Sequence, residues 1–215
     1  VIQPITKSNV PWVNASKETP SVRLSIPITD TTQISMYGLV VNPGLIVTNA
    51  HLFYTNIDDP ASYDPNRTLI ITQGGIQHKI VVTANQLMLD KTRDLVFVQV
   101  PLVGIPQKAK LSVQPPKSGE ATFNGETIRY IIRGNDIYYT TTSQNGYCGL
   151  PITMPNGEII GFHRGALSRH AYGEKIGCVV TPRDVSEALS HFDMTAFDIT
   201  MNLSLEGSIF DKKLS

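Results

Sequence analysis

The chain has 215 residues, of which 41% are hydrophobic, and its 18 basic side chains balance 18 acidic ones. This length and composition suit a globular protein with one substantial core or two small adjoining cores. A formal charge of zero excludes an overall field that would draw the chain to nucleic acid or an anionic membrane, and no stretch approaches the ~20 apolar residues of a membrane span.

Short β-strands are expected along most of the chain. Alternating or β-branched runs recur about every ten residues, as in a β-sandwich or β-barrel. In the first half these runs are 21–28, 34–41, 44–48, 68–72, 79–84 and 94–100, and in the second half they are 110–113, 126–133, 136–142, 151–154, 158–163 and 176–180. Prolines at 101, 106, 115 and 116 interrupt the series, and proline removes a ladder donor. The interruption therefore predicts a connector between two β units.

One helix is expected near the carboxyl end. Thr181 can cap it, Pro182 suits the first helical position, and the helix should end near His191. We therefore expect a first β unit over residues 1–105, a connector over 106–119, a second β unit with the helix over 120–191, and an arm or tail over 192–215.

Cys148 and Cys178 are the two cysteines of the chain. They are too few for a disulfide framework and lack the spacing of a zinc site, so we expect no metal and no other cofactor. A reducing compartment fits best. Asn-x-Ser/Thr triplets at positions 14, 66 and 202 leave a glycosylated, secreted protein as an alternative.

The tetrapeptide Gly146-Tyr147-Cys148-Gly149 places a thiol in a glycine-flanked turn. A thiol attacks as the thiolate, so a cysteine nucleophile needs a neighbouring base or a positive environment. Glycines let such a turn direct successive backbone N–H groups at one point. We expect an oxyanion hole there, formed by the amides of Gly146, Tyr147 and Cys148. A buried structural cysteine in a glycine-rich turn is the alternative.

His51 is the candidate base, because it follows an apolar run and should emerge at the end of a buried strand. Asp94 opens the most apolar run of the chain, where an unpaired carboxylate is costly. A carboxylate that fixes the histidine tautomer and stabilises its cation belongs at such a strand edge. The alternatives for Asp94 are a pair with Arg93 or a turn cap, and Asp90 is the nearest substitute.

His163 ends the expected strand 158–163, downstream of Cys148. A neutral imidazole there can donate to a side-chain carbonyl, and Ser143 can add a hydroxyl. If the thiol cleaves a peptide bond, the two side chains together describe a pocket for the glutamine, or the glutamate, that precedes this bond. Tyr139 is a candidate to fix the His163 tautomer, and Tyr138 is as plausible. The alternative is that His163 is a satisfied core histidine.

These motifs resemble the viral chymotrypsin-like cysteine proteases of the 3C-like type, and most closely the nuclear inclusion proteases of potyviruses. The likeness extends from about Ser21 to Leu189. It rests on Met36-Tyr37-Gly38, Thr48-Asn49-Ala50-His51-Leu52-Phe53, Arg93-Asp94, Pro106-Gln107-Lys108, the Gly-x-Cys-Gly turn with Pro151, and Gly161-Phe162-His163. The resemblance implies an all-β fold, a chymotrypsin-like double β-barrel with a short C-terminal helix, and a triad of His51, Asp94 and Cys148.

The resemblance also implies an activity. The chain would be a cysteine endopeptidase that cleaves a viral polyprotein after Gln or Glu and is released from it into the host cell cytoplasm, with polyprotein segments as its peptide substrates. Arg164, Gly165 and Ala166 would border the pocket and pair with the substrate backbone. One alternative is a module that binds viral RNA through Lys108, Lys110, Arg129 and Arg133, and another is an inactive, partner-binding relative.

Overall fold

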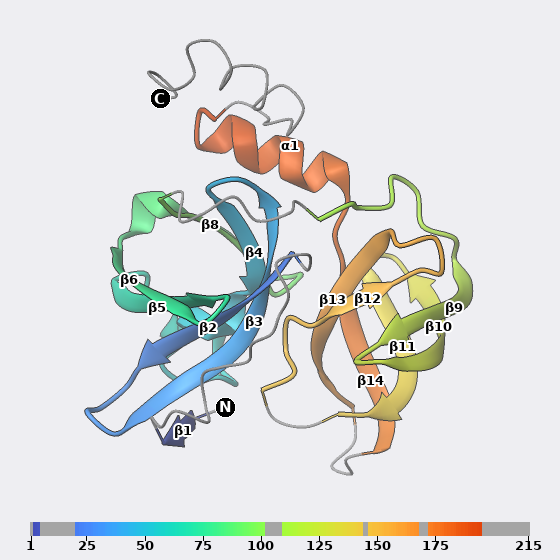
Figure 1. Cartoon of the computed structure of the whole chain (residues 1–215), viewed down its shortest axis with the longest axis horizontal. Coiled ribbons are helices and arrows are strands. Elements are labelled where there is room, and N and C mark those ends of the chain that lie inside the picture. Colours follow the sequence, from blue (N-terminus) through green and yellow to red (C-terminus); the bar gives the residue numbers. More distant parts are fainter. Residues whose placement is uncertain (1, 5–19, 102–108, 144–145, 168–171, 195–215) are drawn as a thin grey trace.

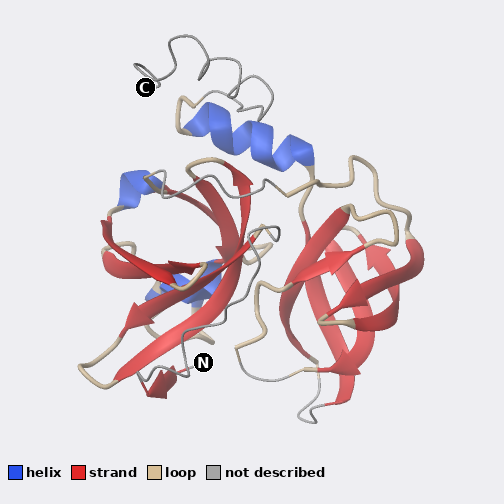
Figure 2. Ribbon diagram, viewed as in Figure 1, coloured by secondary structure: helices blue, strands red, loops and turns tan. Residues whose placement is uncertain are grey.

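The structure is a computed structural model that describes residues 2–4, 20–101, 109–143, 146–167 and 172–194. It consists of two β bodies that lie side by side, with one helix across one end of both (Figures 1 and 2). Every strand pairing within the two bodies is antiparallel. None of the helices in the described residues is long and apolar enough to cross a membrane.

The first body is an eight-stranded sheet that curves around its own core (Figure 1). Its strands are β1 (Ile2–Pro4), β2 (Ser21–Pro27), β3 (Thr32–Asn42), β4 (Leu45–Asn49), β5 (Arg67–Gln73), β6 (Ile76–Val82), β7 (Leu87–Asp90) and β8 (Leu95–Gln99). Within the described residues, three short 3-10 helices lie between these strands, at η2 (Ala50–Phe53), η3 (Pro60–Ser62) and η4 (Ala84–Gln86). The strand order is β6-β5-β2-β3-β4-β8-β7, and β1 pairs with β3.

The second body is a closed six-stranded barrel. Its strands are β9 (Ser118–Phe123), β10 (Glu126–Arg133), β11 (Asp136–Thr142), β12 (Pro151–Thr153), β13 (Ile159–Ala166) and β14 (Tyr172–Val179). They close in the order β10-β11-β14-β13-β12-β9. The two bodies together form the double barrel of chymotrypsin-like proteins, and the all-β fold class is therefore confirmed.

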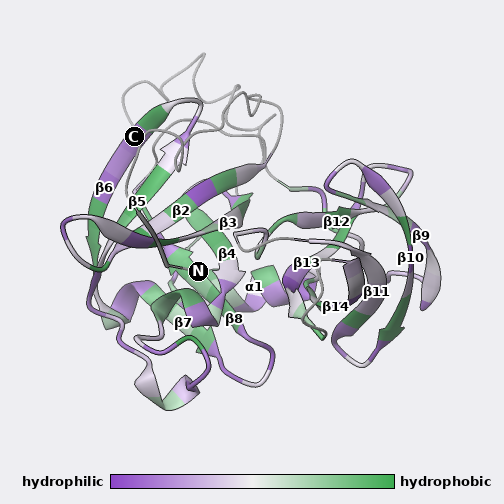
Figure 3. Ribbon diagram, turned by 90° about the horizontal axis from the view of Figure 1, so that it is seen from below, coloured by the Kyte–Doolittle hydropathy of each residue, from purple (hydrophilic) through white to green (hydrophobic). Residues whose placement is uncertain are grey.

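Three apolar clusters hold the molecule together. The first cluster lies inside the first body, and strands with alternating polarity supply it. Val22, Leu24 and Ile26 of β2 belong to this cluster, and hydrophobic and hydrophilic residues alternate along β2 in Figure 3. A second cluster fills the second barrel around Phe123. The third joins residues of both bodies to the helix α1 (Pro182–His191). Burial of this shared cluster fixes one body against the other.

The helix α1 begins as its sequence predicts. The side chain of Thr181 accepts from the backbone N–H of Asp184, and Asp184 caps Thr181 in return. Asp184 also forms an ion pair with Arg93 of the first body. The two terminal nitrogens of Arg93 donate to the carboxylate oxygens of Asp184 at 2.8 and 3.0 Å. This ion pair lowers the pKa of Asp184, although burial alone would raise it. One helix cap therefore also ties the two bodies together.

Of the twelve expected strands, 126–133 and 136–142 have the observed bounds, nine are shifted by one to four residues at one or both ends, and one is absent. Residues 110–113 form no strand, because Leu111 makes only an isolated bridge to Ile159. The strands β1, β7 and β9 are not predicted by the sequence pattern, and β9 starts within the expected connector. The connector residues 106–108 and the tail residues 195–215 lie outside the described residues, so the division into domains stays a prediction.

Candidate active site

His51, Asp94 and Cys148 line one cavity of about 540 Å³. His51 lies in η2, directly after β4, and Asp94 lies in the turn between β7 and β8. Cys148 comes from the second body, in the turn between β11 and β12. Three segments that are far apart in the sequence thus meet at the seam between the two bodies.

Asp94 holds the backbone and the ring of His51 together. Its Oδ1 accepts from the His51 backbone N–H at 2.9 Å, and its Oδ2 lies 2.7 Å from His51 Nδ1. Asn49 donates to the same Oδ2 at 3.3 Å. Asp94 adopts a left-handed backbone conformation, with φ of 55°, which its carbonyl stabilises by accepting from Ala50 N–H at 2.9 Å. The carboxylate therefore faces the ring and not Arg93, which was one of the alternatives.

The surroundings of His51 favour its charged form. Burial alone would lower the pKa of this imidazole, but the hydrogen bonds and negative charges of Asp94 and Cys148 raise it to about 10. An imidazolium beside a thiol stabilises the thiolate, which is the reactive form of cysteine. The pair His51 and Cys148 therefore has the electrostatics of a nucleophile and its base.

The two cysteines lie in opposite environments. Cys148 is half-buried, and its thiol donates to the Arg164 carbonyl at 3.3 Å. Cys178 is 1% exposed, its thiol donates to the Arg93 carbonyl at 3.0 Å, and burial raises its pKa. A buried thiol with a raised pKa is a poor nucleophile, as expected for Cys178 from its apolar strand.

The turn that carries Cys148 contacts both bodies. Gly149 N–H donates to His163 O at 2.8 Å, while Tyr37 N–H of β3 donates to Cys148 O at 2.8 Å. Arg23 of β2, 8% exposed, reaches Gly146 O at 3.4 Å. Gly146 and Gly149 have φ of 96° and 89°, a conformation that side chains disfavour. The oxyanion hole expected at Gly146, Tyr147 and Cys148 stays a prediction.

His163 lies inside the second barrel, where it is 3% exposed. Its Nδ1 lies 2.5 Å from the Tyr139 hydroxyl, and its ring packs 5.0 Å from the Phe123 ring centroid. The Tyr138 hydroxyl instead lies 3.4 Å from Asp136. Burial and the charges of Lys175 and His51 lower the pKa of His163 to about 4, so the ring is neutral near pH 7. Of the two tyrosines considered, Tyr139 is thus the partner of the imidazole.

The other residues expected at the substrate pocket come from β13 and from the end of β11. Arg164, Gly165 and Ala166 continue β13 and line the cavity beside Cys148. Ser143 follows β11 and is 8% exposed. Of the residues expected for RNA binding, Arg129 and Arg133 are exposed on β10 and Lys110 is exposed, while Lys108 lies outside the described residues. RNA binding stays a prediction.

One basic side chain at the site, that of Arg23, was not predicted from the sequence, and Arg164 was predicted only as a border of the substrate pocket. The side chain of Arg164 lies 3.7 Å from Asp94 and 3.8 Å from Asp136, between the two bodies. Arg23 stacks over the Tyr37 ring at 4.8 Å. Neither belongs to a motif, and only the pairing of β2 with β3 and the position of β13 bring them to the site.

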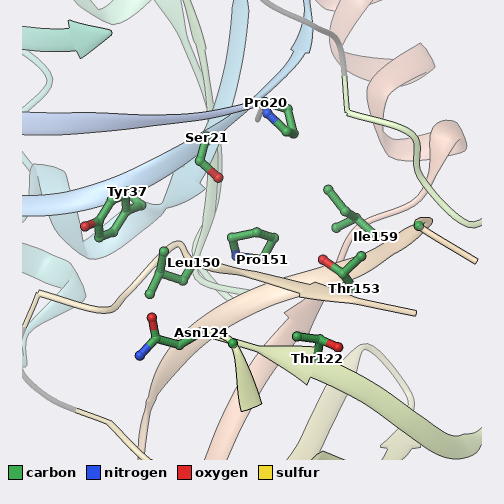
Figure 4. A pocket seen from close by; sticks show the side chains of 11 residues that line it. Pro20, Ser21, Tyr37, Thr122, Asn124, Leu150, Pro151, Thr153 and Ile159 are labelled. Atoms are coloured by element: carbon green, nitrogen blue, oxygen red, sulfur yellow. The ribbon is translucent and has the colours of Figure 1, made fainter. Parts of the chain in front are cut away.

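A second cavity, of about 450 Å³, lies between the bodies. Figure 4 shows Pro20, Ser21 and Tyr37 of the first body on one side and Thr122 and Thr153 of the second on the other. Leu150 and Pro151 lie between the two sides, directly after the Cys148 turn. The segment 148–151 therefore lines two cavities, the first through Cys148 and the second through Leu150 and Pro151.

The low pKa of His163 predicts an acid-sensitive fold. Unfolding releases the ring to its ordinary pKa of 6.5, whereas in the fold it is about 4, so the unfolded state binds the proton first as pH falls. Stability that is present above pH 6.5 is then lost between pH 6.5 and 4, by ~3 kcal/mol at most. Urea unfolding at pH 7.5 and 4.5 should show a larger loss in the native chain than in His163→Gln. Equal losses in the two proteins would contradict this assignment.

Known structures with this fold include viral proteases. The chain is similar to the tobacco etch virus protease complexed with substrate, at 18% identity over 87% of this chain and 90% of that chain, with a TM-score of 0.61. It is similar to the tobacco vein mottling virus protease, at 18% identity over 85% and 88%, with a TM-score of 0.62. It is also similar to a human pathogenic astrovirus serine protease, at 18% identity over 77% and 91%, with a TM-score of 0.52.

No protein-family model matches the sequence, and no curated protein sequence gives a significant match. At 18% identity the structural likeness shows the fold alone, and it covers most of each chain. The proteins that share the fold include a serine protease, so the identity of the nucleophile must be argued from the residues of this site.

Proposed function

We propose that the chain is a cysteine endopeptidase with Cys148 as nucleophile, His51 as general base and acid, and Asp94 as the residue that orients His51. The observation that carries this proposal is the shared cavity in which a half-buried thiol meets an imidazole held by a carboxylate at 2.7 Å. A buried structural cysteine would need none of these neighbours.

The proposed reaction has two stages. With its proton held by His51, the Cys148 thiolate attacks the scissile carbonyl carbon while the amides of the glycine turn receive the oxyanion. The C–N bond then breaks, and His51 returns the proton to the leaving amine, which leaves a thioester. His51 next deprotonates a water molecule, whose oxygen displaces the sulfur and releases a carboxylate product and the free thiol.

We further propose that the residue before the cut is Gln or Glu. The phenol of Tyr139 donates to His163 Nδ1 in the tautomer that keeps a proton on Nε2, and Nε2–H is then the donor for a substrate side-chain carbonyl. The lowered pKa of His163 supports a neutral ring at pH 7, and a neutral donor suits the amide of Gln better than it suits a charged group. Because structures that share the fold are viral proteases, we also propose viral polyprotein segments as the substrates and the host cytoplasm as the place of cleavage.

The test is mass spectrometry of a mixed peptide library after incubation with the native protein. Cuts that follow Gln or Glu would establish both the activity and the first pocket. Cuts after other residues would contradict the proposed specificity for Gln or Glu but would still establish that the chain is a protease. A library that stays intact with folded protein would overturn the proposal.

Removal of the Tyr139 hydroxyl should weaken the choice of Gln. In Tyr139→Phe the His163 ring loses the partner 2.5 Å from Nδ1, so its proton is no longer confined to Nε2. We expect kcat/KM for a Gln peptide to fall about tenfold, as a lost hydrogen bond of ~1.5 kcal/mol predicts. Tyr138→Phe is the matched control, because its hydroxyl does not contact His163. Equal kinetics in the two variants would contradict a role for Tyr139.

A further inference from the structure

The first residues of the chain add a strand to the edge of β3. Ile2, Gln3 and Pro4 pair antiparallel with Ile34, Gln33 and Thr32, and Figure 1 shows β1 beside the start of β3. An edge that takes up one extended segment through backbone hydrogen bonds can take up another of the same polarity.

The other end of this edge touches the nucleophile. Tyr37 N–H donates to Cys148 O, and Tyr37 lies three residues after Ile34, about 10 Å along a strand. In an antiparallel sheet, the N–H and C=O of every second residue face the same neighbour. The backbone groups of Gln33 and Ser35 therefore face the same side as Tyr37 N–H, and the edge runs from β1 to the Cys148 turn.

The polarity of β1 matches that of a leaving peptide. Because β1 is antiparallel to β3, its amino-terminal residue Ile2 is the end nearer to Tyr37 and Cys148, and Pro4 is the end farther away. The part of a substrate that follows the cut also has its new amino terminus at the nucleophile and runs away from it. On the other side of Cys148, the cavity is bordered by Arg164, Gly165 and Ala166 of β13.

We propose that the edge of β3 from Thr32 to Ser35 binds the substrate segment after the cut as an extended strand, and that β1 occupies this site within the same molecule. The inference rests on the proposed protease function. The occupant and the substrate segment compete for the same backbone groups, so β1 must leave before a peptide with several residues after the cut can bind. Substrates that end at the cut need no such exchange.

The test compares two substrates with three proteins. One substrate carries a fluorophore directly after Gln, and the other carries six residues after the same cut. Gln3→Pro removes the N–H that pairs with Gln33, whereas the control Gln3→Ala keeps it. We expect Gln3→Pro to lower KM for the long substrate about fivefold relative to the native protein, as loss of one hydrogen bond predicts. KM for the short substrate should stay within about twofold, and Gln3→Ala should behave as the native protein does.

Parallel changes of KM for both substrates, or no change for either, would overturn the inference. A variant that lacks residues 1–4 gives a second test, because a peptide with the sequence of residues 1–6 should inhibit it against the long substrate and not against the short one. Failure of the protease proposal has a different signature, since the native protein would then cleave neither substrate. Fluorescence polarisation with Cys148→Ala then compares the affinity of the long peptide with and without Gln3→Pro, and equal affinities again overturn the inference.

Discussion

Exchange of Cys148 for alanine is expected to abolish peptide cleavage while leaving the fold intact. Loss of a nucleophile typically lowers the rate by a factor on the order of 10⁴ to 10⁶. The thiol is half-buried and bonds the Arg164 carbonyl, so its removal leaves a small gap and few unsatisfied groups. The measurement is kcat/KM on a Gln peptide, together with the melting temperature of both proteins.

Two comparisons sharpen this result. Cys148→Ser keeps a hydroxyl in the same turn but is a weaker nucleophile, so its activity should lie between those of the native protein and Cys148→Ala. Iodoacetamide should label Cys148 long before Cys178, because Cys178 is 1% exposed and its pKa is raised by burial. Cleavage that persists in Cys148→Ala would remove the nucleophile from the proposal, whatever the labelling shows.

Exchange of Gly149 for alanine is expected to disrupt the joint between the two bodies. Gly149 has φ of 89°, and a Cβ built on it would overlap the backbone carbonyl of Tyr37. Neither backbone can yield freely, since Gly149 N–H bonds His163 O and Tyr37 N–H bonds Cys148 O. We expect a loss of ~3–5 kcal/mol in the free energy of unfolding, with cleavage lost because β3 and the nucleophile turn must separate.

Gly157 provides a matched control. Its φ is also 89°, but a Cβ there would meet nothing within 4 Å. Gly157→Ala therefore measures only the left-handed strain, about 1–2 kcal/mol, and should keep activity. Urea unfolding of the two variants separates backbone strain from steric overlap. Similar losses in both would mean that the overlap with Tyr37 is relieved without cost.

The Gly146–Gly149 turn and His51 stand out in the sequence because the roles proposed for them need fixed residue types close together. Glycines on both sides of Cys148 and an apolar run before His51 carry that information locally. The strands with strong alternation were predicted for the same reason, and β10 and β11 have the expected bounds. The helix was predicted from its cap, Thr181, and its first residue, Pro182.

The strands and contacts that the sequence did not predict depend on pairings between separate segments, which no local pattern encodes. The strand β9 begins Ser-Gly-Glu, which has little preference for strands, and it forms because β10 and β12 lie beside it. The side chain of Arg164 reaches Asp94 only once two bodies are assembled. Arg93 likewise was considered as a partner of its neighbour Asp94, but its partner is Asp184, far along the chain.

The consecutive residues Arg93 and Asp94 have a consequence for how the molecule loses activity. Arg93 forms an ion pair with Asp184 of the helix and donates to the Val179 carbonyl at 2.7 Å. Asp94 is hydrogen-bonded to the ring of His51. A rocking motion of one body on the other would pull on Arg93 and be transmitted through one peptide bond to the imidazole. We therefore expect peptide cleavage to be lost on gentle heating, at a temperature at which the sheets of both bodies are still folded.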